Sequence, residues 1–573
     1  MTTSYSQNKP VEVLITQGAS LTSSGSKSVG SAAASTATAT VAVIVVTWNR
    51  YRDVDNIVRS LSRQEYPRER MHVIVVDNSS TDGTLNRLDE LWSPDLIVEN
   101  ATDKAHEPRF EPLTRRNARG PATGANKGDF ASLTIIRNHA NLGGCGGFNT
   151  GLSYIAHAMA AKGNPPDFAW LVDDDADVPP NALVELTKAA ASDPKIGLVG
   201  SRTVDIANRH TTIESTIYLN RANGIMGDEP TLDHPQRKAY EQWIATVGSP
   251  RGEARDTGLR DVDVVSACSM LARWSAVEQV GFWDWRYFIY CDDADWCLRF
   301  GKAGYRVVLN LDAAVYHTPW NMKLTIARIY YAQRNLLWML QKVMPPEQLR
   351  RILKRRMYSI LRDSLRAGLH RRLFHAEIIR RTALDVVTNR AGKLDNDGPT
   401  PEPVMDSLRK AGVLKKDRRI AVLCSAHPSV GWADQLRHHV AQHLNVAGGE
   451  AMPAWTYVVR NDVPDHGGHG EPAETRPYRL VYGARRRARL RRQYRILTQR
   501  PDLIVVYDQT TDFPAVLGTW NLHIDTRKLT TGQLERDGFV PRMKFLSRWS
   551  AAAVRCVWYA LTAKPFQSTT RYG

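Results

Sequence analysis

The sequence predicts an α/β fold, a doubly wound mixed sheet of mainly parallel strands, because strand and helix patterns alternate along the chain. Residues 41–47 form a nearly uninterrupted β-branched run, which is typical of a buried central strand. Apolar helical spacing follows this run, so right-handed crossovers would place helices on both faces of the sheet. Residues 99–130 are polar and rich in turn residues, which predicts a loop insertion. Further strands are expected at residues 72–76, 133–136, 168–172 and 196–200.

The chain has 573 residues, which is more than one hydrophobic core usually serves, so we expect several parts. Residues 1–40 are rich in Ser, Thr, Ala and Gly, which predicts a disordered tail. Residues 41–340 would form the main α/β domain and residues 341–393 a basic helical segment. Residues 404–573 would form a C-terminal domain of unknown role. In it, a small α/β sheet is expected from strands at 419–423 and 502–507.

The composition limits the function classes. A hydrophobic fraction of 43% indicates a globular protein, and the net charge of +17 indicates an anionic partner. That partner could be nucleic acid, anionic lipid or a phosphorylated substrate. No nucleic-acid reader motif is present, which leaves a basic nucleic-acid-binding protein as the disfavoured alternative. The six cysteines show no metal spacing, and no apolar run is long enough for a signal core or a membrane span, so we expect a cytoplasmic protein.

Three adjacent carboxylates follow the strand expected at 168–172. Asp173, Asp174 and Asp175 repel one another unless a cation neutralises them. Because side chains alternate along a strand, Asp173 and Asp175 can direct oxygens at one hard divalent ion. The carboxyl ends of strands are also where open α/β sheets bind ligands. The plainer alternative is a solvated acidic turn.

A glycine-rich turn lies at residues 143–147, before a helical pattern. Glycines let the backbone approach a ligand closely, and the free amides of a helix start can face a phosphate. The spacing matches neither the dinucleotide-binding fingerprint nor a P-loop. A purely structural role for the glycines stays open.

A second acidic pair, Asp292 and Asp293, stands among aromatic residues at the expected start of a helix. Buried carboxylates are destabilising unless they are paired or used, whereas a helix N-terminus stabilises them. A helix-capping role for Asp292 is the alternative. His317 ends another apolar run, and a lone histidine in this position is more often structural than a ligand.

Taken in order, these motifs resemble the family-two inverting glycosyltransferases, which have the A-type nucleotide-sugar fold. The resemblance is closest to actinobacterial galactofuranosyltransferases that build cell-wall galactan on a polyprenyl-diphosphate lipid, and Asp292-Asp293-Ala294-Asp295 is its most specific part. The amino-terminal β-rich module of the polymerising members is replaced here by the tail of residues 1–40. Rhamnosyltransferases share most of the motifs, which keeps dTDP-rhamnose open as the donor. The matching stretches are residues 47–50, 76–84, 141–149, 173–175, 291–299, 317 and 330–335.

The resemblance implies a donor site and a metal site. Asp77 would hydrogen-bond the nucleotide base, with Asn49 and Arg50 lining its pocket. A Mn²⁺ or Mg²⁺ ion on the donor diphosphate would be held by Asp173, Asp175 and His317. The remaining donor-binding residues expected from the resemblance are Thr47, Asn141, Gly143, Gly144, Asn149 and Asp174.

The resemblance also implies an acceptor site and a catalytic base. Asp293, with Asp292 beside it, would take the proton from the acceptor hydroxyl. An unperturbed aspartate has a pKa of about 3.9, so this base would be ionised at neutral pH. Trp283 and Trp285 offer faces on which an acceptor sugar could stack, although core packing is an equal alternative. A phosphatase with a strand-end aspartate nucleophile would leave Asp77 and the acidic pair unused.

The expected partners are UDP-galactofuranose, a polyprenyl-diphosphate-linked glycan acceptor and an anionic membrane surface, with no nucleic acid. From residue 350 to residue 381 there are eleven Lys and Arg against two acids on a helical pattern, and residues 485–492 form a second basic run. Basic amphipathic helices bind membrane surfaces, so we expect a peripheral protein on the inner face of the cell membrane. A solvated helix packed on the catalytic domain is the alternative.

Overall fold

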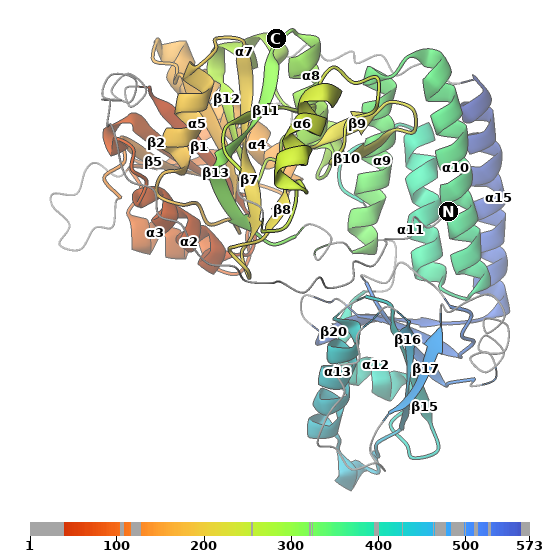
Figure 1. Cartoon of the computed structure of the whole chain (residues 1–573). Coiled ribbons are helices and arrows are strands. Elements are labelled where there is room, and N and C mark those ends of the chain that lie inside the picture. The colour runs from red at the N-terminus through yellow and green to blue at the C-terminus, as the bar shows by residue number, and fades with distance from the viewer. Residues whose placement is uncertain are drawn as a thin grey trace, which may run out of the picture.

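The computed structural model describes residues 39–562 with several gaps. The gaps are residues 103–107, 116–127, 254–255, 320–322, 324, 395–399, 427, 462, 464–476, 483–497, 499, 509–513, 525 and 527–528. The expected tail of residues 1–40 and the basic run at 485–492 therefore lie almost wholly outside the described residues. Figure 1 shows three parts: a large α/β domain, a layer of long helices beside it, and a smaller α/β domain below.

The large domain is built on a mixed sheet of 11 strands, which confirms the predicted fold class. Strand β1 (Val41–Thr47) lies between β2 (Met71–Asp77) and β6 (Phe168–Asp173) and is parallel to both. The order across the sheet is β11-β13-β7-β12-β6-β1-β2-β5-β3-β4, with β8 paired to β7. The other strands are β3 (Leu96–Asn100), β4 (Phe110–Arg115), β5 (Ser132–Asn138), β7 (Ile196–Asp205), β8 (Thr212–Glu214), β11 (Leu259–Asp261), β12 (Ser269–Arg273) and β13 (Arg306–His317). A separate hairpin pairs β9 (Tyr218–Asn220) with β10 (Ile225–Gly227).

Both faces of the sheet are covered, because alternate residues of each central strand point to opposite sides. Val43 and Val45 of β1 belong to one core, while Ala42 and Ile44 belong to the other. The first core is closed by α2 (Tyr51–Ser62), α3 (Thr84–Trp92) and α5 (Ala182–Ala191). The second is closed by α4 (Gly143–Tyr154), α7 (Trp274–Val280) and α8 (Asp292–Lys302), with α6 (Arg237–Val247) further out.

Two parts of the sheet differ from the sequence prediction. The loop expected at 99–130 was wrong in part, because β3 reaches Asn100 and β4 pairs with it antiparallel. Strand β4 carries Pro112 and lies at the edge of the sheet, where a residue without an N–H is tolerated. Strand β12 runs antiparallel between β6 and β7, a pairing for which the five residues give no local signal.

Four long helices form the layer at the right of Figure 1: α9 (Ile326–Val343), α10 (Pro346–Leu369), α11 (Leu373–Val387) and α15 (Phe539–Thr562). Helix α15 follows the C-terminal domain in sequence but packs on α10 and α11. Its Phe545 ring lies over Gly368, where a Cβ would come within 2.2 Å of the ring. Its Trp549 indole donates to the Leu361 carbonyl at 3.0 Å. No helix in the described part of the chain has the length and hydropathy needed to span a membrane.

The C-terminal domain has a seven-stranded sheet in the order β14-β20-β19-β18-β15-β16-β17. Along the chain, α12 (Val404–Ala411) follows β14 and α13 (Ser429–His443) follows β15. The buried Arg372 guanidinium joins this domain to the helical layer by donating to the Asn521 side chain at 2.7 Å and the Val516 carbonyl at 3.0 Å. The strands are β14 (Glu402–Pro403), β15 (Arg419–Cys424), β16 (Ala454–Arg460), β17 (Tyr478–Tyr482), β18 (Leu503–Tyr507), β19 (Trp520–Ile524) and β20 (Thr531–Arg536).

Candidate active site

Polar side chains gather where the carboxyl ends of β1, β2, β6 and β13 meet. The register pairs Thr47 with Asp77 and Val46 with Asp173, so these residues reach the same edge of the sheet. His317 is the last residue of β13. Asp174 and Asp175 directly follow the end of β6 and lie at the same edge. The sheet thus assembles residues that are up to 270 positions apart, from Thr47 to His317.

Asp173, Asp175 and His317 lie close enough to share one ion. One ligand atom from each falls within 4.8 Å of the others. The His317 Nε2 atom lies 3.5 Å from Asp173 Oδ2 and 3.1 Å from Asp175 Oδ1. Two carboxylates and one imidazole suit Mn²⁺ and are compatible with Mg²⁺, so the residues present fit the expected metal.

Two basic side chains already neutralise this cluster. The Lys323 ammonium lies 2.6 Å from Asp175 Oδ2 and 3.0 Å from His317 Nε2. The Arg50 guanidinium donates to Asp174 at 3.0 Å and to Asp175 at 2.9 Å. Lys323 was not singled out from the sequence, because nothing in its surroundings marks it. A divalent ion on these ligands would take over the role of its ammonium group.

The pKa values of Asp174, Asp175 and His317 are shifted in different directions because their surroundings differ. Burial raises the pKa of Asp174 to about 7, although Arg50 and Thr47 act in the opposite direction. Burial alone would raise the pKa of Asp175, but His317, Lys323 and Arg50 hold it below its usual range. Burial would lower the pKa of His317, yet the hydrogen bonds to Asp173 and Asp175 raise it to about 9. Metal binding at His317 therefore requires the imidazole to release a proton.

The expected nucleotide pocket is held together by hydrogen bonds between two turns. Asn49 has a left-handed φ of 54°, and its side-chain oxygen accepts from the Thr81 amide at 2.7 Å. Asp77 is 1% exposed and accepts from the Ser80 amide at 3.2 Å. Burial raises the pKa of Asp77. Thr47 donates its hydroxyl to Asp174 at 2.8 Å, so the turns after β1 and β2 and the acidic turn form one connected unit.

The glycine-rich turn begins helix α4, and packing explains two of its glycines, Gly143 and Gly147, as well as Gly151 further along the helix. A Cβ on Gly147 would lie 2.3 Å from Val46, and one on Gly151 would lie 2.5 Å from Ile44, so the helix sits directly on β1. Gly143 has a φ of 75°, and a Cβ there would lie 2.1 Å from the Phe288 carbonyl oxygen. A Cβ on Gly144 would meet nothing within 4 Å, so among these four glycines it is Gly144 that faces open space.

Two amide side chains expected at the donor are engaged within the protein. Asn149 is 2% exposed and clamps the Trp283 backbone, donating to its carbonyl and accepting from its amide, both at 2.9 Å. Both ends of the Asn149 amide are occupied within the protein, and its donor-binding role stays a prediction. Asn141 accepts from the Gly143 amide at 2.9 Å and so shapes the turn.

The two tryptophans expected at the acceptor have different surroundings. Trp283 is 1% exposed and packs against Phe148 and Trp296, with ring centroids 5.1 and 5.6 Å away. This burial matches the core-packing alternative, and the acceptor-stacking role of Trp283 stays a prediction. Trp285, in a short turn of 3₁₀-helix, is half-buried.

Asp292 and Asp293 begin α8, as expected, but neither is its capping residue. Cys291 occupies that position, so the capping role considered for Asp292 was wrong. Asp293 accepts from the Ala294 amide at 2.7 Å and from the Ala267 amide at 3.4 Å. Burial raises the pKa of Asp293 to about 6, against the ordinary value expected from the sequence. Burial and the Asp293 charge raise the pKa of Asp292 well above its ordinary value.

A strained loop places this acidic pair. Phe288, Tyr290 and Cys291 have φ values of 68°, 70° and 58°, which non-glycine residues rarely adopt. Asn335 is fully buried on α9 and donates to the carbonyls of Tyr287, Ile289 and Tyr290 at 2.7–2.9 Å.

Arg334, the preceding residue of α9, is also fully buried and supports the same loop. Its guanidinium donates to the carbonyls of Arg286 and Tyr287 at 3.2 and 3.0 Å. Both residues lie within the motif at 330–335, but sequence reasoning gave them no role.

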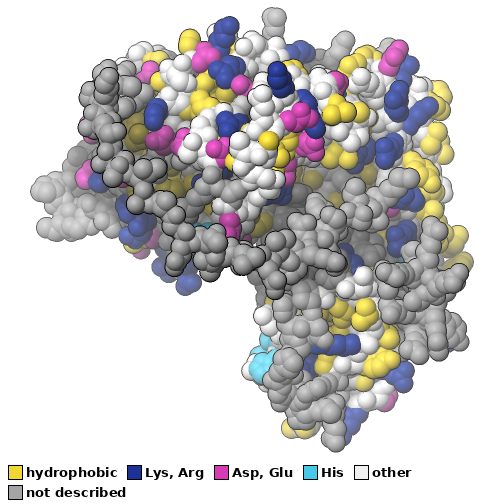
Figure 2. Space-filling model, in the orientation of Figure 1, with side chains coloured by type: hydrophobic (Ala, Val, Ile, Leu, Met, Phe, Trp, Pro, Cys, Tyr) yellow, Lys and Arg dark blue, Asp and Glu magenta, His cyan; other side chains and the backbone are white. Residues whose placement is uncertain are grey.

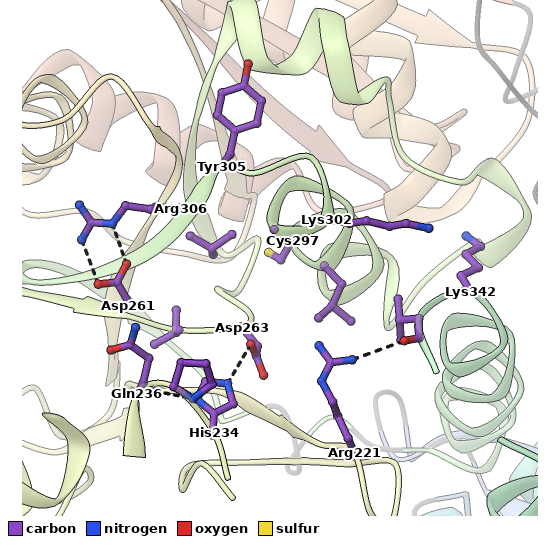
Figure 3. Close-up of a pocket in the computed structure, with 16 residues that line it drawn as sticks. Arg221, His234, Gln236, Asp261, Asp263, Cys297, Lys302, Tyr305, Arg306 and Lys342 are labelled. Atoms are coloured by element: carbon purple, nitrogen blue, oxygen red, sulfur yellow. Dashed lines mark hydrogen bonds and ion pairs between the residues drawn. The ribbon is translucent and has the colours of Figure 1, made fainter. Parts of the chain in front are cut away.

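A cavity of about 620 Å³ lies elsewhere in the domain and is shown in Figure 3. Its walls come from the C-terminal half of α8 and the first residues of β13, whereas the acidic pair starts α8 and His317 ends β13. Within it Arg306 faces Asp261, and His234 faces Asp263 (Figure 3). This cavity is therefore separate from the candidate active site.

Residues 42–251 match the family model described as Glycosyl transferase family 2. The chain is also 27% identical over 281 residues to an N-acetylglucosaminyl-diphospho-decaprenol L-rhamnosyltransferase of Mycobacterium tuberculosis, covering 48% of this chain and 75% of that protein. The sheet and the family match together show the A-type glycosyltransferase fold.

Similar solved structures include GalNAc-T7 with UDP, GalNAc and Mn²⁺, at 13% identity and a TM-score of 0.35. That alignment covers 53% of this chain and 47% of GalNAc-T7, so the chain spans about half the length of that protein. TarS 1–349 of S. aureus is 16% identical with a TM-score of 0.35, covering 61% of this chain and 81% of the TarS fragment.

Proposed function

We propose, since residues 42–251 match the glycosyl transferase family 2 model, that this protein transfers a sugar from a nucleotide-diphosphate donor to a cell-envelope glycan acceptor. The observation that carries the proposal is the cluster of Asp173, Asp175 and His317 at the carboxyl edge of the sheet, together with the half-buried Asp293 at the start of α8. This edge combines a metal site with a carboxylate of near-neutral pKa, the two components that inverting transfer needs.

Asp173, Asp175 and His317 would hold Mn²⁺ or Mg²⁺ against the donor diphosphate. The ion supplies positive charge that stabilises the leaving nucleotide. Arg50 binds the same acidic turn, and Asp77 with Asn49 forms the rim on which the base of the nucleotide would rest. Gly144 provides the open approach for the donor sugar.

Asp293 would act as the general base that accepts the proton of the attacking acceptor hydroxyl. Its pKa of about 6 lies near working pH, where a base is both ionised and basic enough to be effective. Attack from the side opposite the leaving diphosphate inverts the anomeric centre. Burial and the Asp293 charge raise the pKa of Asp292, which disfavours a second negative charge beside the base.

Two donor sugars follow from different observations. The acidic motif at residues 292–295 favours UDP-galactofuranose, whereas the similarity to a mycobacterial rhamnosyltransferase favours dTDP-rhamnose. That relative acts on a diphospho-decaprenol glycan, which supports a polyprenyl-diphosphate-linked acceptor here. Such an acceptor places the enzyme at the inner face of the cell membrane, on an anionic lipid surface.

A donor screen tests the proposal. Purified protein with Mn²⁺ and a short polyprenyl-diphosphate glycan is offered UDP-galactofuranose and dTDP-rhamnose, and nucleotide release is measured with the mass of the product. We expect one donor to be consumed with addition of one or more sugars to the acceptor. Failure to use any nucleotide sugar, with the metal bound, would contradict the assigned activity.

A further inference from the structure

Helix α15 carries an unusual concentration of exposed apolar side chains. Seven of the sixteen large hydrophobic side chains that are exposed among the described residues lie on this one helix of 24 residues. Single exposed apolar residues are common on soluble proteins, but a contiguous group marks a binding surface. The seven are Phe539, Val540, Met543, Val554, Val557, Trp558 and Leu561.

These residues lie on one side of the helix as an interrupted stripe, with one group at each end and the exposed Ser547 and Ser550 between the groups. With about 100° of rotation per residue, all seven fall within an arc of roughly 100°. The opposite side of the helix is buried against α10 and α11 through Phe545, Ala552 and Cys556. The stripe therefore faces away from the protein along a helix about 36 Å long.

The charged side chains of α15 beside this stripe are all basic. Lys544, Arg548 and Arg555 are exposed along one border of it, and α15 contains no Asp or Glu. Neighbouring α10 exposes further basic residues with the apolar Tyr358 and Leu369 among them. In Figure 2, hydrophobic and basic side chains alternate along the edge where Figure 1 places α10 and α15. The exposed basic residues of α10 are Arg350, Arg351, Lys354, Arg355, Arg362 and Arg366.

We infer that α15 is an interfacial helix, which lies in the surface of an anionic lipid bilayer with its apolar stripe inserted and its basic border at the headgroups. An apolar stripe whose charged neighbours on α15 itself are all basic matches the apolar interior and negative surface of such a bilayer. A second copy of this chain would bring two basic surfaces together, which disfavours a dimer through this face. The inference extends the basic-helix prediction, because it assigns the insertion to α15 and limits α10 to the charged border.

The buried arginines of α11 sharpen this assignment. Arg380 and Arg381 are 6% and 7% exposed, and Arg372, just before α11, is fully buried. These three belong to the basic stretch at 350–381 but face the protein, so they cannot reach lipid. The membrane-facing charge of the helical layer therefore comes from α10 and α15.

Vesicle flotation of the full chain, without any nucleotide sugar, tests the inference. The vesicles contain phosphatidylcholine with or without about one-third phosphatidylglycerol. We expect the wild-type protein to float with the anionic vesicles. Combined Val554→Ser, Val557→Ser and Trp558→Ser changes should weaken this binding by about 100-fold, since three apolar side chains no longer insert. Combined Lys544→Gln and Arg555→Gln changes should weaken it by about 5-fold for each charge.

Matched controls use exposed residues elsewhere. Leu232→Ser with Val446→Ser replaces side chains that are 83% and 73% exposed, and Lys415→Gln with Lys416→Gln removes two exposed charges of the C-terminal domain. Both controls should bind as the wild type does, and circular dichroism should show all variants folded. Wild-type protein that stays unbound, or apolar variants that bind normally, would overturn the inference. So would a wild-type dimer that the apolar changes convert to monomers.

The inference rests on the proposed function in one respect: membrane binding would bring the enzyme to a lipid-linked acceptor. Flotation requires no sugar transfer, so membrane binding can still be measured and interpreted if the donor screen fails. Conversely, an active enzyme that does not bind vesicles would contradict the role of α15 as an interfacial helix, and the transferase proposal would be unaffected.

Discussion

Both α/β sheets of the chain present the carboxyl ends of parallel strands, but different side chains gather there. At the edge of the first sheet, Asp77, Asp173 and His317 end three of the strands. In the second sheet, β15 ends at Cys424 and β18 at Tyr507, both buried in the core of that domain. The architecture alone therefore predicts no chemistry, and the side chains at the strand ends decide which edge has a site.

The edge of the second sheet supports the first domain instead. The Asp508 carboxylate, directly after β18, accepts from the Thr526 amide and hydroxyl at 3.2 and 2.6 Å. The Asp508 carbonyl accepts from the Ile326 amide at 2.7 Å, at the start of α9. Asp173 thus belongs to the candidate metal cluster at one edge, whereas the backbone carbonyl of Asp508 at the other edge accepts from the first residue of α9.

The largest effect should come from removing the metal ligands of the first edge. Asp175→Ala should lower sugar transfer by about 10³-fold or more, because the charge on the leaving diphosphate is no longer offset. EDTA should abolish transfer by the wild-type protein, and added Mn²⁺ should restore it. Activity in the presence of chelator would contradict the roles of Asp173, Asp175 and His317.

Asp293→Asn should follow, with a fall in turnover of about 10²-fold or more. The amide keeps the size of the side chain, so thermal unfolding and donor affinity should stay close to the wild-type values. Asp292→Asn is the matched control, and it should retain much more activity because burial and the Asp293 charge raise the pKa of Asp292 and so disfavour its charged form. Equal losses in the two variants would argue against a base at Asp293.

The same residue predicts the acid limb of the pH profile. Since the base works only when ionised, turnover should be full above its pKa of about 6 and should fall as the pH drops below that value. A bound divalent ion near Asp173 would shift this limb to lower pH, because it offsets a negative charge that raises the pKa of Asp293. If the fall in turnover at low pH persists in Asp293→Asn, it reports the titration of another group.

Asn335→Ala should have an intermediate effect, since this residue positions the loop before Asp292 without touching substrate. Losing three buried hydrogen bonds should destabilise the fold by about 1–3 kcal/mol. The turnover number should fall by about 10-fold, while the KM for the nucleotide sugar stays near the wild-type value. Calorimetry and donor kinetics measure both, and a changed KM with normal turnover would contradict a positioning role.

Asp508→Ala should have the smallest effect and completes the comparison of the two edges. It removes two hydrogen bonds to Thr526, so we expect a loss of about 1–2 kcal/mol in unfolding free energy. Transfer at saturating substrate should be unchanged at a temperature where the variant is folded. A large catalytic loss would show that the second sheet takes part in the chemistry.

The sequence predicted those features that depend on short-range patterns. Strand β1 was expected at its observed bounds, because an unbroken β-branched run has only one favourable conformation. The cluster of Asp173, Asp175 and His317 was also expected, since strand ends place their residues by topology. The metal, base and donor roles themselves stay predictions.

The sequence did not predict what depends on long-range packing. Trp283 and Asn149 are 134 residues apart and form a buried pair that no local pattern signals. The pKa of Asp293 depends on burial by segments far away in the sequence. The support of the strained loop by Asn335 likewise depends on how α9 packs beside it.

The return of α15 to the helical layer affects how the chain folds during synthesis. The hydrogen bond from Trp549 to Leu361 spans 188 residues, and the one from Tyr559 to Gln341 spans 218. At ribosomal speeds of about 5–20 residues per second, α10 waits roughly 10–40 s before α15 is made. During that interval the groove at Gly368 lies open to water and to other nascent chains. Chaperone demand in this protein should therefore peak late in translation, at the helical layer.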